Sequence, residues 1–542
     1  AELARALAAG HGSEPATATD TAARVRESRP KMSRAVVFVL GLLVTATMGL
    51  LLWQRGDRPA GPGGTAAQRH AEAVLGTQPP ALTEQPSVAV LPFANLSPDP
   101  ANEYFSDGMT EELITALSQV EGLRVAARAS SFAFKGKPLD VAEVAQKLNV
   151  GAVLDGSVRR AGQRLRVTAE LVDARGGTRL WAERYDRELR DVFQVQDELA
   201  RAIVGALQVP LKLTSRSDTA LVRAGTRDPA AHDLYLQGRF LWNQRTHEAL
   251  SRAIGYFERA IGRDSSYAEA YAGLADCYLL LPQTGPARPR DMYPKAKQAV
   301  EHALELDSTL AEAHTSIALL RMQGDYDWHG AEAGFQRALA LNPSYATAHQ
   351  WYSSYLAATG RPEEALAEIL RAQALDPLSR VISANVAQRL AYLGRYDEAL
   401  RQIRSTIELD PNFPNAHSGL CQVYALQGLP RQAIAPCERA SALLKRPVGL
   451  LAYVQAASGN RTRATAIVRE LVARSRREYV APVGIAIGYF GLGDSDATFA
   501  WLDSAYAVRD PGLTTFFTSP LSAPLYSDPR TTRLRTRMGL PP

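Results

Sequence analysis

The first clear hydrophobic pattern in the chain is an uninterrupted apolar run over residues 35–53. Its sequence, AVVFVLGLLVTATMGLLLW, contains no charged side chain. A helix of this length spans about 28 Å at 1.5 Å per residue, close to the ~30 Å hydrocarbon core of a bilayer. The pattern therefore predicts one transmembrane helix, Ala35 to Trp53.

Basic residues on either side of this run predict its orientation. Five Lys or Arg residues lie between residues 24 and 34, against three between residues 55 and 69. An excess of positive charge marks the cytoplasmic side. We expect residues 1–34 to be a cytoplasmic tail, and the protein to be a single-pass protein of the inner or cytoplasmic membrane with extracytoplasmic C-terminal domains. Residues 54–86, rich in Gly, Pro, Ala and Gln, are predicted to form a flexible linker.

Residues 87–209 show short apolar runs that alternate with helical patterns. The run SVAVLPF at residues 87–93 predicts a buried strand, and FQVQDELARAIVGAL at residues 193–207 predicts an amphipathic helix. Between Leu165 and Leu171 apolar and polar residues alternate, so one face of that strand should be solvent-exposed. The order β-α-β-α-β-β-β-α predicts a small α/β domain with a mixed sheet.

This region resembles a known bacterial domain. The segments SVAVLPFANLSPDPANEYFSDGMTEELITALSQV and GAVLDGSVRRAGQRLRVTAELVDARGGTRLWAERYDR are similar to the TolB N-terminal-like domain of bacterial signalling proteins. The resemblance covers about 120 residues. It implies a non-enzymatic domain that makes protein contacts.

From residue 228 onward the chain repeats itself about every 34 residues. Small residues recur at the start of each second helix: Ala253, Ala296, Ala331, Ala365, Ala399, Ala433 and Ala464. Turn glycines recur in the same register at Gly360, Gly394, Gly428, Gly459 and Gly493. This helix-turn-helix period resembles the tetratricopeptide repeat (TPR). It predicts an all-α TPR solenoid of about eight repeats over residues 228–512.

Two segments depart from the repeat pattern. Residues 282–291, PQTGPARPRD, lengthen one interval and predict a longer loop between helices. Residues 513–542 lack the repeat markers, and we expect them to cap the apolar face of the last repeat. The predicted fold class is therefore multidomain: one transmembrane helix, a small α/β domain with a mixed sheet, and an all-α TPR solenoid.

Composition and charge exclude several function classes. The net charge is +5 over 542 residues, and no basic cluster is interleaved with aromatics, so we expect no nucleic-acid partner. Three cysteines without a CxxC pair exclude a disulfide-rich scaffold and a cysteine-based zinc site. No catalytic motif or phosphate loop is present in the chain, so we expect no catalytic residues and no cofactor. His314, His349 and His417 share one repeat position, which favours packing over metal binding.

The candidate functional residues lie in the repeats. Polar residues predicted on the concave face, which is built from first helices, form a candidate groove for proteins or peptides: Thr315, Gln350, Ser354, Gln388, Ser418 and Gln422. Cys421 and Cys437 lie on the two helices of one repeat. They are either two small buried thiols or a disulfide that links the two helices of the hairpin.

The opening residues suggest a context for these domains. AELARALAAG, residues 1–10, resembles the last helix region of bacterial Ser/Thr protein kinases, which implies a kinase domain before residue 1. We predict a membrane-anchored interaction and sensing module of a bacterial signalling protein. The alternatives are a free-standing envelope scaffold, or the sensor part of an adenylate cyclase or of a winged-helix transcription regulator.

Overall fold

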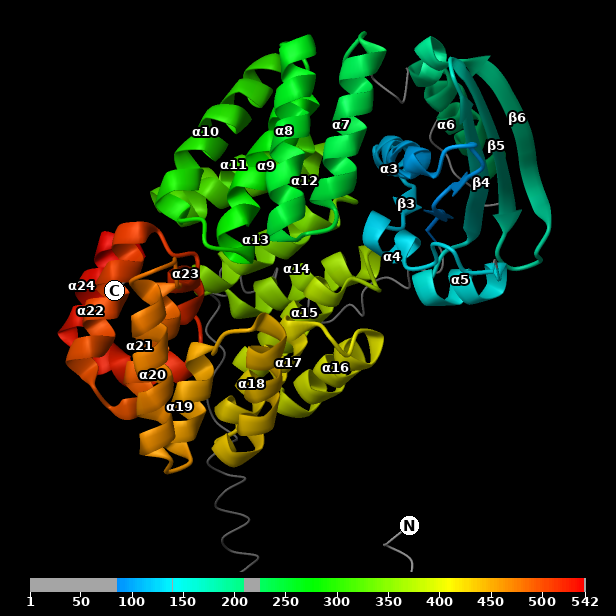
Figure 1. The fold of residues 1–542 in the computed structure, drawn as a ribbon. Coiled ribbons are helices and arrows are strands. Elements are labelled where there is room, and N and C mark those ends of the chain that lie inside the picture. The colour runs from blue at the N-terminus through cyan, green and yellow to red at the C-terminus, as the bar shows by residue number, and fades with distance from the viewer. Residues whose placement is uncertain (1–84, 139, 209–224, 541–542) are drawn as a thin grey trace, which may run out of the picture. The chain divides into compact units, whose positions relative to one another are not determined.

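The computed structural model describes residues 85–138, 140–208 and 225–540. Within these residues an α/β domain comes first and an array of paired helices follows (Figure 1).

No helix in the described part of the chain is both long enough and apolar enough to cross a bilayer. The longest described helix, α10 (Pro289–Leu306), carries six charged residues among eighteen. This finding contradicts the predicted fold class with one transmembrane helix and the predicted single-pass membrane location, so both are wrong for the described chain. Residues 35–53 lie outside the described residues, as do residues 1–34 and most of the linker 54–86. The corrected fold class is a small mixed-sheet α/β domain joined to an all-α TPR solenoid.

One mixed sheet forms the centre of the α/β domain. Its strands are β1 (Ser87–Val90), β2 (Ala94–Asn95), β3 (Arg124–Val125), β4 (Ala152–Ala161), β5 (Arg164–Asp173) and β6 (Arg179–Glu188). The order is β3-β1-β4-β5-β6, and β2 pairs with β4. β1 is parallel to β3 and β4, whereas β4, β5 and β6 form an antiparallel meander. Tight turns at Gly162 and Gly177, both with positive φ, join the meander strands.

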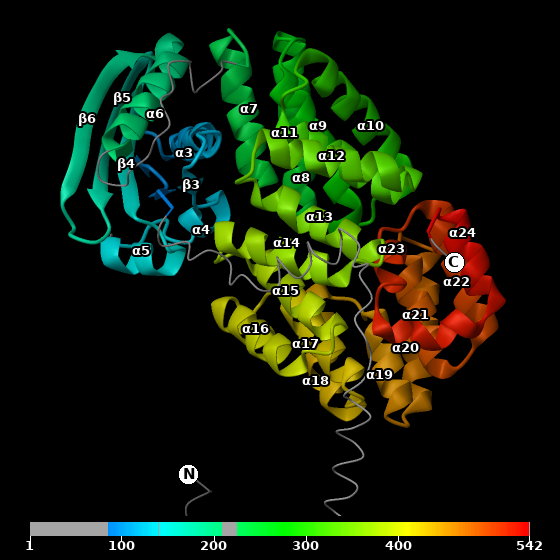
Figure 2. The same ribbon diagram turned by 180° about the vertical axis from the view of Figure 1, so that it is seen from behind.

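Helices cover both faces of the sheet near β1. α3 (Glu103–Ser118) and α6 (Val192–Gln208) pack on one face, and α5 (Val141–Leu148) packs on the other (Figures 1 and 2). All four residues of β1 are buried, as expected of a strand covered on both sides. In β5 the alternate apolar positions predicted from the sequence are buried, and Arg166 and Thr168 between them are exposed, which confirms the one exposed face.

Sixteen helices in eight consecutive pairs form the array. They are α7 (Pro229–Trp242), α8 (His247–Arg263), α9 (Ala268–Thr284), α10 (Pro289–Leu306), α11 (Ala311–Leu320), α12 (Trp328–Leu341), α13 (Ala346–Ala358), α14 (Pro362–Leu375), α15 (Arg380–Tyr392), α16 (Tyr396–Leu409), α17 (Pro414–Leu426), α18 (Pro430–Leu444), α19 (Gly449–Ala457), α20 (Arg461–Ser475), α21 (Pro482–Leu492) and α22 (Ser495–Val508). Each helix packs against its partner and against the next pair.

The sequence markers of the repeat have the expected structural roles. All seven periodic alanines, from Ala253 to Ala464, are fully buried, because a larger side chain would separate the packed helices. The five turn glycines have φ between 71° and 94°, a left-handed conformation that costs glycine little. Both observations confirm the repeat register.

The insertion at residues 282–291 is not the long loop that we expected. Pro282 to Thr284 extend α9, and α10 begins at Pro289, so only residues 285–288 connect the two helices. Proline suits the first position of a helix, where its missing N–H has no intrahelical partner, which explains the early start of α10.

The C-terminal segment, residues 512–540, packs on the last pair and also reaches the middle of the array. It contains α23 (Gly512–Phe516), a 3-10 helix at Pro520–Ser527 and α24 (Pro529–Arg537). Its apolar residues share a core with Phe499 of α22 and with Tyr326, which precedes α12. The Trp328 indole N–H of α12 donates to the Met538 carbonyl at 2.5 Å. This segment therefore covers the last repeat and ties it to an earlier one.

The α/β domain contacts the array at two places. α3 packs against α7 (Figures 1 and 2). At the second place the Ala127 N–H donates to the Leu375 carbonyl at the end of α14, and the Asn342 side chain donates to Ser118 at 3.0 Å.

Candidate functional site

Three of the predicted groove residues lie together on successive first helices. The Gln388 amide of α15 donates to the Gln422 amide oxygen of α17 at 3.3 Å. Gln422 in turn donates to the Tyr392 hydroxyl at 3.0 Å, and Ser354 of α13 accepts from Arg389 at 3.1 Å. We call Ser354, Gln388, Gln422 and Tyr392 the polar row. All four side chains are half-buried.

Arg389 lies behind the polar row and was missed in the sequence analysis. Its side chain is only 3% exposed, and its guanidinium donates to the hydroxyls of Ser353 and Ser354 and to the Gln388 amide oxygen. Burial lowers the pKa of Arg389, and no carboxylate of a described residue pairs with it. A buried cation with neutral partners makes the neighbouring surface electropositive.

The other predicted groove residues have different environments. Gln350 and Ser418 are half-buried on α13 and α17, and their role in a groove stays a prediction. Thr315 is 0% exposed and its hydroxyl donates to the Ala311 carbonyl of its own helix at 2.8 Å. Thr315 therefore does not line a groove surface in this structure.

The three periodic histidines make the same local contact. Nε2 of His314, His349 and His417 lies 2.9–3.0 Å from the carbonyl oxygen six residues earlier in the chain. Nδ1 of His349 also contacts Glu368 at 2.6 Å. Each imidazole therefore holds the turn that enters its own first helix. This repeated contact accounts for the period without a ligand.

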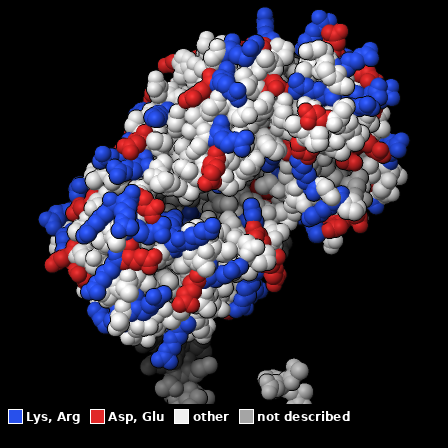
Figure 3. Space-filling view, viewed as in Figure 1, with Lys and Arg blue, Asp and Glu red and all other residues white. Residues whose placement is uncertain are grey.

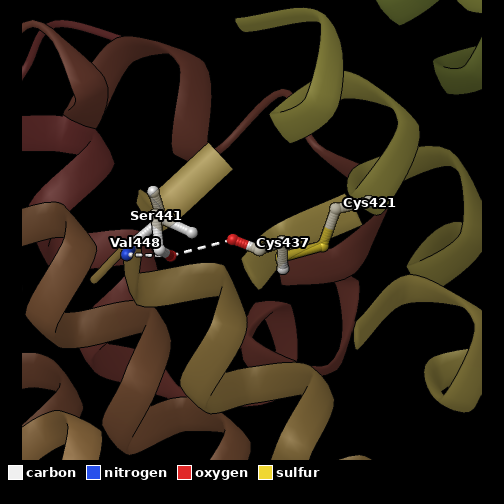
Figure 4. The surroundings of a disulfide bond; sticks show 4 residues. All are labelled: Cys421, Cys437, Ser441 and Val448. Atoms are coloured by element: carbon white, nitrogen blue, oxygen red, sulfur yellow. Dashed lines mark hydrogen bonds between the residues drawn. A yellow bond between two sulfur atoms is a disulfide. The ribbon is translucent and has the colours of Figure 1, made fainter. Parts of the chain in front are cut away.

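Cys421 of α17 and Cys437 of α18 are joined by a disulfide (Figure 4). Both cysteines are fully buried. Next to them the Ser441 hydroxyl donates to the Cys437 carbonyl at 2.8 Å and accepts from the Val448 N–H at 3.2 Å. The bond links the two helices of one repeat directly beside the polar row. Cys277 is buried and free.

A second group of charged residues joins the α/β domain to the array, and no pattern in the sequence indicated it. Glu111 of α3 pairs with Arg239 of α7 at 3.0 Å and with Arg128 at 3.0 Å, and it accepts from Asn243 at 2.9 Å. Burial by itself raises the pKa of Glu111, but the two guanidinium groups lower it below its usual value. The carboxylate therefore stays ionised and fixes α3 on α7.

Two features of the array are typical of TPR proteins. Its helices are paired in TPR register, and half-buried polar side chains lie along the first helices. The chain contains a TPR-type array, a fold that serves as a protein-interaction scaffold. The family comparison agrees: a tetratricopeptide repeat model matches residues 323–380 and 387–443.

The α/β domain matches a different model from the one that the sequence suggested. Residues 84–202 match the "HilA/YgeH-like transcriptional regulator, second domain". The resemblance to the TolB N-terminal-like domain stays a prediction, as does the link to a kinase.

Known proteins similar to this chain include an adenylate cyclase and a transcriptional regulator, as they are named. The chain is 41% identical over 269 residues to "Putative adenylate cyclase 3" of Rhizobium meliloti (strain 1021), which covers 49% of this chain and 44% of that protein. It is 28% identical over 143 residues to "Transcriptional regulator HilA" of Salmonella typhimurium, which covers 26% of each. The chain thus spans less than half the length of the curated relatives it matches.

A solved TPR structure is also similar. A thermophilic TPR protein of Thermus thermophilus is 21% identical, with a TM-score of 0.31, over 36% of this chain and 99% of that one.

Proposed function

We propose that this chain is the partner-binding, sensing part of a bacterial regulatory protein whose output activity resides in another part. Support comes from the relatives: one is named an adenylate cyclase and another a transcriptional regulator, and each shares less than half of its length with this chain. These names favour the cyclase or transcription-regulator context over the kinase context predicted from residues 1–10.

The polar row is the observation that carries the proposal. Ser354, Gln388 and Gln422 come from three successive first helices and are connected through Arg389 and Tyr392 by hydrogen bonds. Amide and hydroxyl groups can both donate and accept, so they can bind the main chain of a peptide without selecting one side chain. The repeat presents such groups at regular intervals, which suits a peptide segment that runs across several repeats.

Charge adds a preference for an acidic partner. Arg389 supplies positive potential behind the row, and no described carboxylate pairs with it. Lys and Arg side chains also gather at the lower left of Figure 3. In the sequence of α20, Arg461, Arg463 and Arg469 are exposed. Both sources of positive charge would attract the carboxylate side chains of a partner.

Site-specific crosslinking in cells tests the proposal. A photoreactive amino acid replaces Gln388 in the full chain, and in a matched control it replaces Ser405, an exposed polar residue of α16. We expect irradiation to give a protein adduct at position 388 and none at position 405. Adding Arg389→Met should reduce the adduct at least tenfold.

Two outcomes would reject this role. One is no adduct at position 388, nor at 354 or 422, under conditions in which the chain is expressed and folded. The other is equal adduct formation at positions 388 and 405. A circular dichroism spectrum and a thermal melt of the Arg389→Met chain separate loss of binding from loss of folding.

A further inference from the structure

A cavity of about 440 Å³ lies between the α/β domain and the first repeats of the array. Its walls come from α3 on one side and from α7, α9 and α11 on the other. It is distinct from the polar row, which lies on α13, α15 and α17. Because two parts of the fold line it, a molecule bound here would contact both.

The lining is strongly acidic. Six carboxylates line the cavity: Glu111, Glu112, Glu269, Asp276, Asp307 and Glu312. Arg239 is the one Lys or Arg side chain among its described lining residues, and it is already paired with Glu111. Glu112 contacts His232 at 2.7 Å, and Asp276 accepts from Ser316. Glu111 and Glu112 are thus the lining carboxylates with a described ion-pair partner, and Arg239 and Arg245 also act on Asp276.

Glu269 and Glu312 are the carboxylates without described partners. Each lies in the first turn of its helix, α9 and α11 respectively, and neither side chain makes a hydrogen bond or ion pair with another described residue. Burial raises the pKa of both, that of Glu269 to about 7, and the two carboxylates repel each other. A pair of desolvated like charges requires either protons or an external cation.

A tyrosine gives independent evidence for a ligand. Tyr267 lines the cavity and is only 2% exposed, yet its hydroxyl has no hydrogen-bond partner among the described residues. Burial raises the pKa of Tyr267, and the charges of Glu269 and Glu112 raise it further. No hydrogen bond within the described residues occupies this hydroxyl, so it is available to a ligand in the cavity. The Tyr267 ring lies tilted against the Tyr235 ring, with 5.1 Å between their centroids, and the face of an aromatic ring attracts a cation.

The shape and chemistry favour an organic cation over a metal ion. Within the described residues no group of three or more His, Cys, Asp or Glu side chains is arranged to hold a metal. The wall between the carboxylates is apolar, with Leu236, Ala272 and Leu310 in it. An ammonium group has three donors for carboxylate and hydroxyl oxygens, and a methylene chain suits the apolar wall.

We propose that this cavity binds a small aliphatic amine of the polyamine class, with an ammonium group between Glu269, Glu312 and the Tyr267 hydroxyl. The ligand bridges α3 and the first repeats and so couples the α/β domain to the array. This inference goes beyond the proposed function, since it assigns a small-molecule site apart from the polar row.

Calorimetric titration of the full chain with spermidine tests the site. We expect saturable binding to the wild-type chain and none with 1,8-octanediol, an uncharged chain of similar length. The double variant Glu269→Gln, Glu312→Gln should weaken the Kd at least tenfold. Glu301→Gln, which removes one exposed carboxylate of α10 outside the cavity, should change the Kd less than twofold.

Four results would overturn the proposal: no saturable binding to the wild-type chain, equal binding by the double variant, equal weakening in Glu301→Gln, or full competition by Mg²⁺ at matched ionic strength. Thermal melts of the variants exclude misfolding as the cause of lost binding. Crosslinking at position 388 is a separate measurement, so failure here leaves the partner-binding role unaffected.

Discussion

Replacing Glu269 by glutamine should stabilise the protein at alkaline pH. The Glu269 carboxylate is desolvated in the cavity wall and faces the like charges of Glu112, Asp307 and Glu312, with the Tyr267 hydroxyl alongside. Glutamine keeps the shape of the side chain and removes its charge. The substitution therefore isolates the electrostatic cost of this carboxylate.

The magnitude follows from the pKa of Glu269, which burial raises from 4.5 to about 7. At about 1.4 kcal/mol for each tenfold change in the protonation equilibrium, the ionised carboxylate costs the native state at most about 3 kcal/mol. Since the native pKa is above the unfolded one, the native state binds more protons between pH 4.5 and 7. The free energy of unfolding therefore falls as the pH rises through this window, and the loss is complete above about pH 7.

Urea unfolding at pH 5 and pH 8 measures the effect. We expect Glu269→Gln to raise the free energy of unfolding by about 2–3 kcal/mol relative to wild type at pH 8 and by much less at pH 5. Glu301→Gln, at an exposed site, should change it by less than about 0.5 kcal/mol at either pH. An equal gain at both pH values, or no gain at pH 8, would refute the reasoning that Glu269 is an unpaired buried charge.

Three further changes test the fold: a substitution in a repeat turn, reduction of the disulfide, and a substitution at the contact with the C-terminal segment. Gly394→Ala forces a side chain into a left-handed backbone at φ 74°, so it should lower the free energy of unfolding by roughly 1–2 kcal/mol in a urea titration. The control is Gly484→Ala, inside α21, where there is open space for a methyl group. It should be neutral or stabilising in the same titration. The disulfide between Cys421 and Cys437 closes a short loop, with a sequence separation of 16, so its reduction should lower the free energy of unfolding by about 3 kcal/mol. A thiol reductant should therefore lower the Tm of the wild-type chain. It should leave the Tm of the double alanine variant unchanged. Trp328→Phe removes the indole bond to the C-terminal segment and should cost about 1–2 kcal/mol, and an unchanged urea midpoint would contradict this role for the indole.

The repeat architecture could be predicted because its markers act locally. A glycine such as Gly394 is required by the φ of its own turn, and an alanine such as Ala399 by the nearest helix. These constraints recur at a fixed interval, so periodicity in the sequence reveals them. The alternating residues of β5 were predictable for the same reason, since strand geometry alone puts alternate side chains on opposite faces.

The docking of the α/β domain and the acidic cavity could not be predicted in this way. Glu111 and Arg239 are 128 residues apart, and each by itself has the pattern of a solvated helix residue. Glu269 likewise has the pattern of an acidic residue that stabilises a helix N-terminus. Only the folded chain shows that α3 covers these positions. Arg389 was missed because arginine is rarely buried without a carboxylate partner.

The contact between Trp328 and the C-terminal segment has a mechanical consequence. An open solenoid can extend and contract along its axis, because each repeat contacts only its neighbours. Here residues 326–328 contact residues 506–540, so the helix pairs from α13 and α14 to α21 and α22 form a closed loop. A change in the diameter of that loop requires the contact between Trp328 and the C-terminal segment to break first. The repeats inside the loop should therefore unfold together and not one at a time.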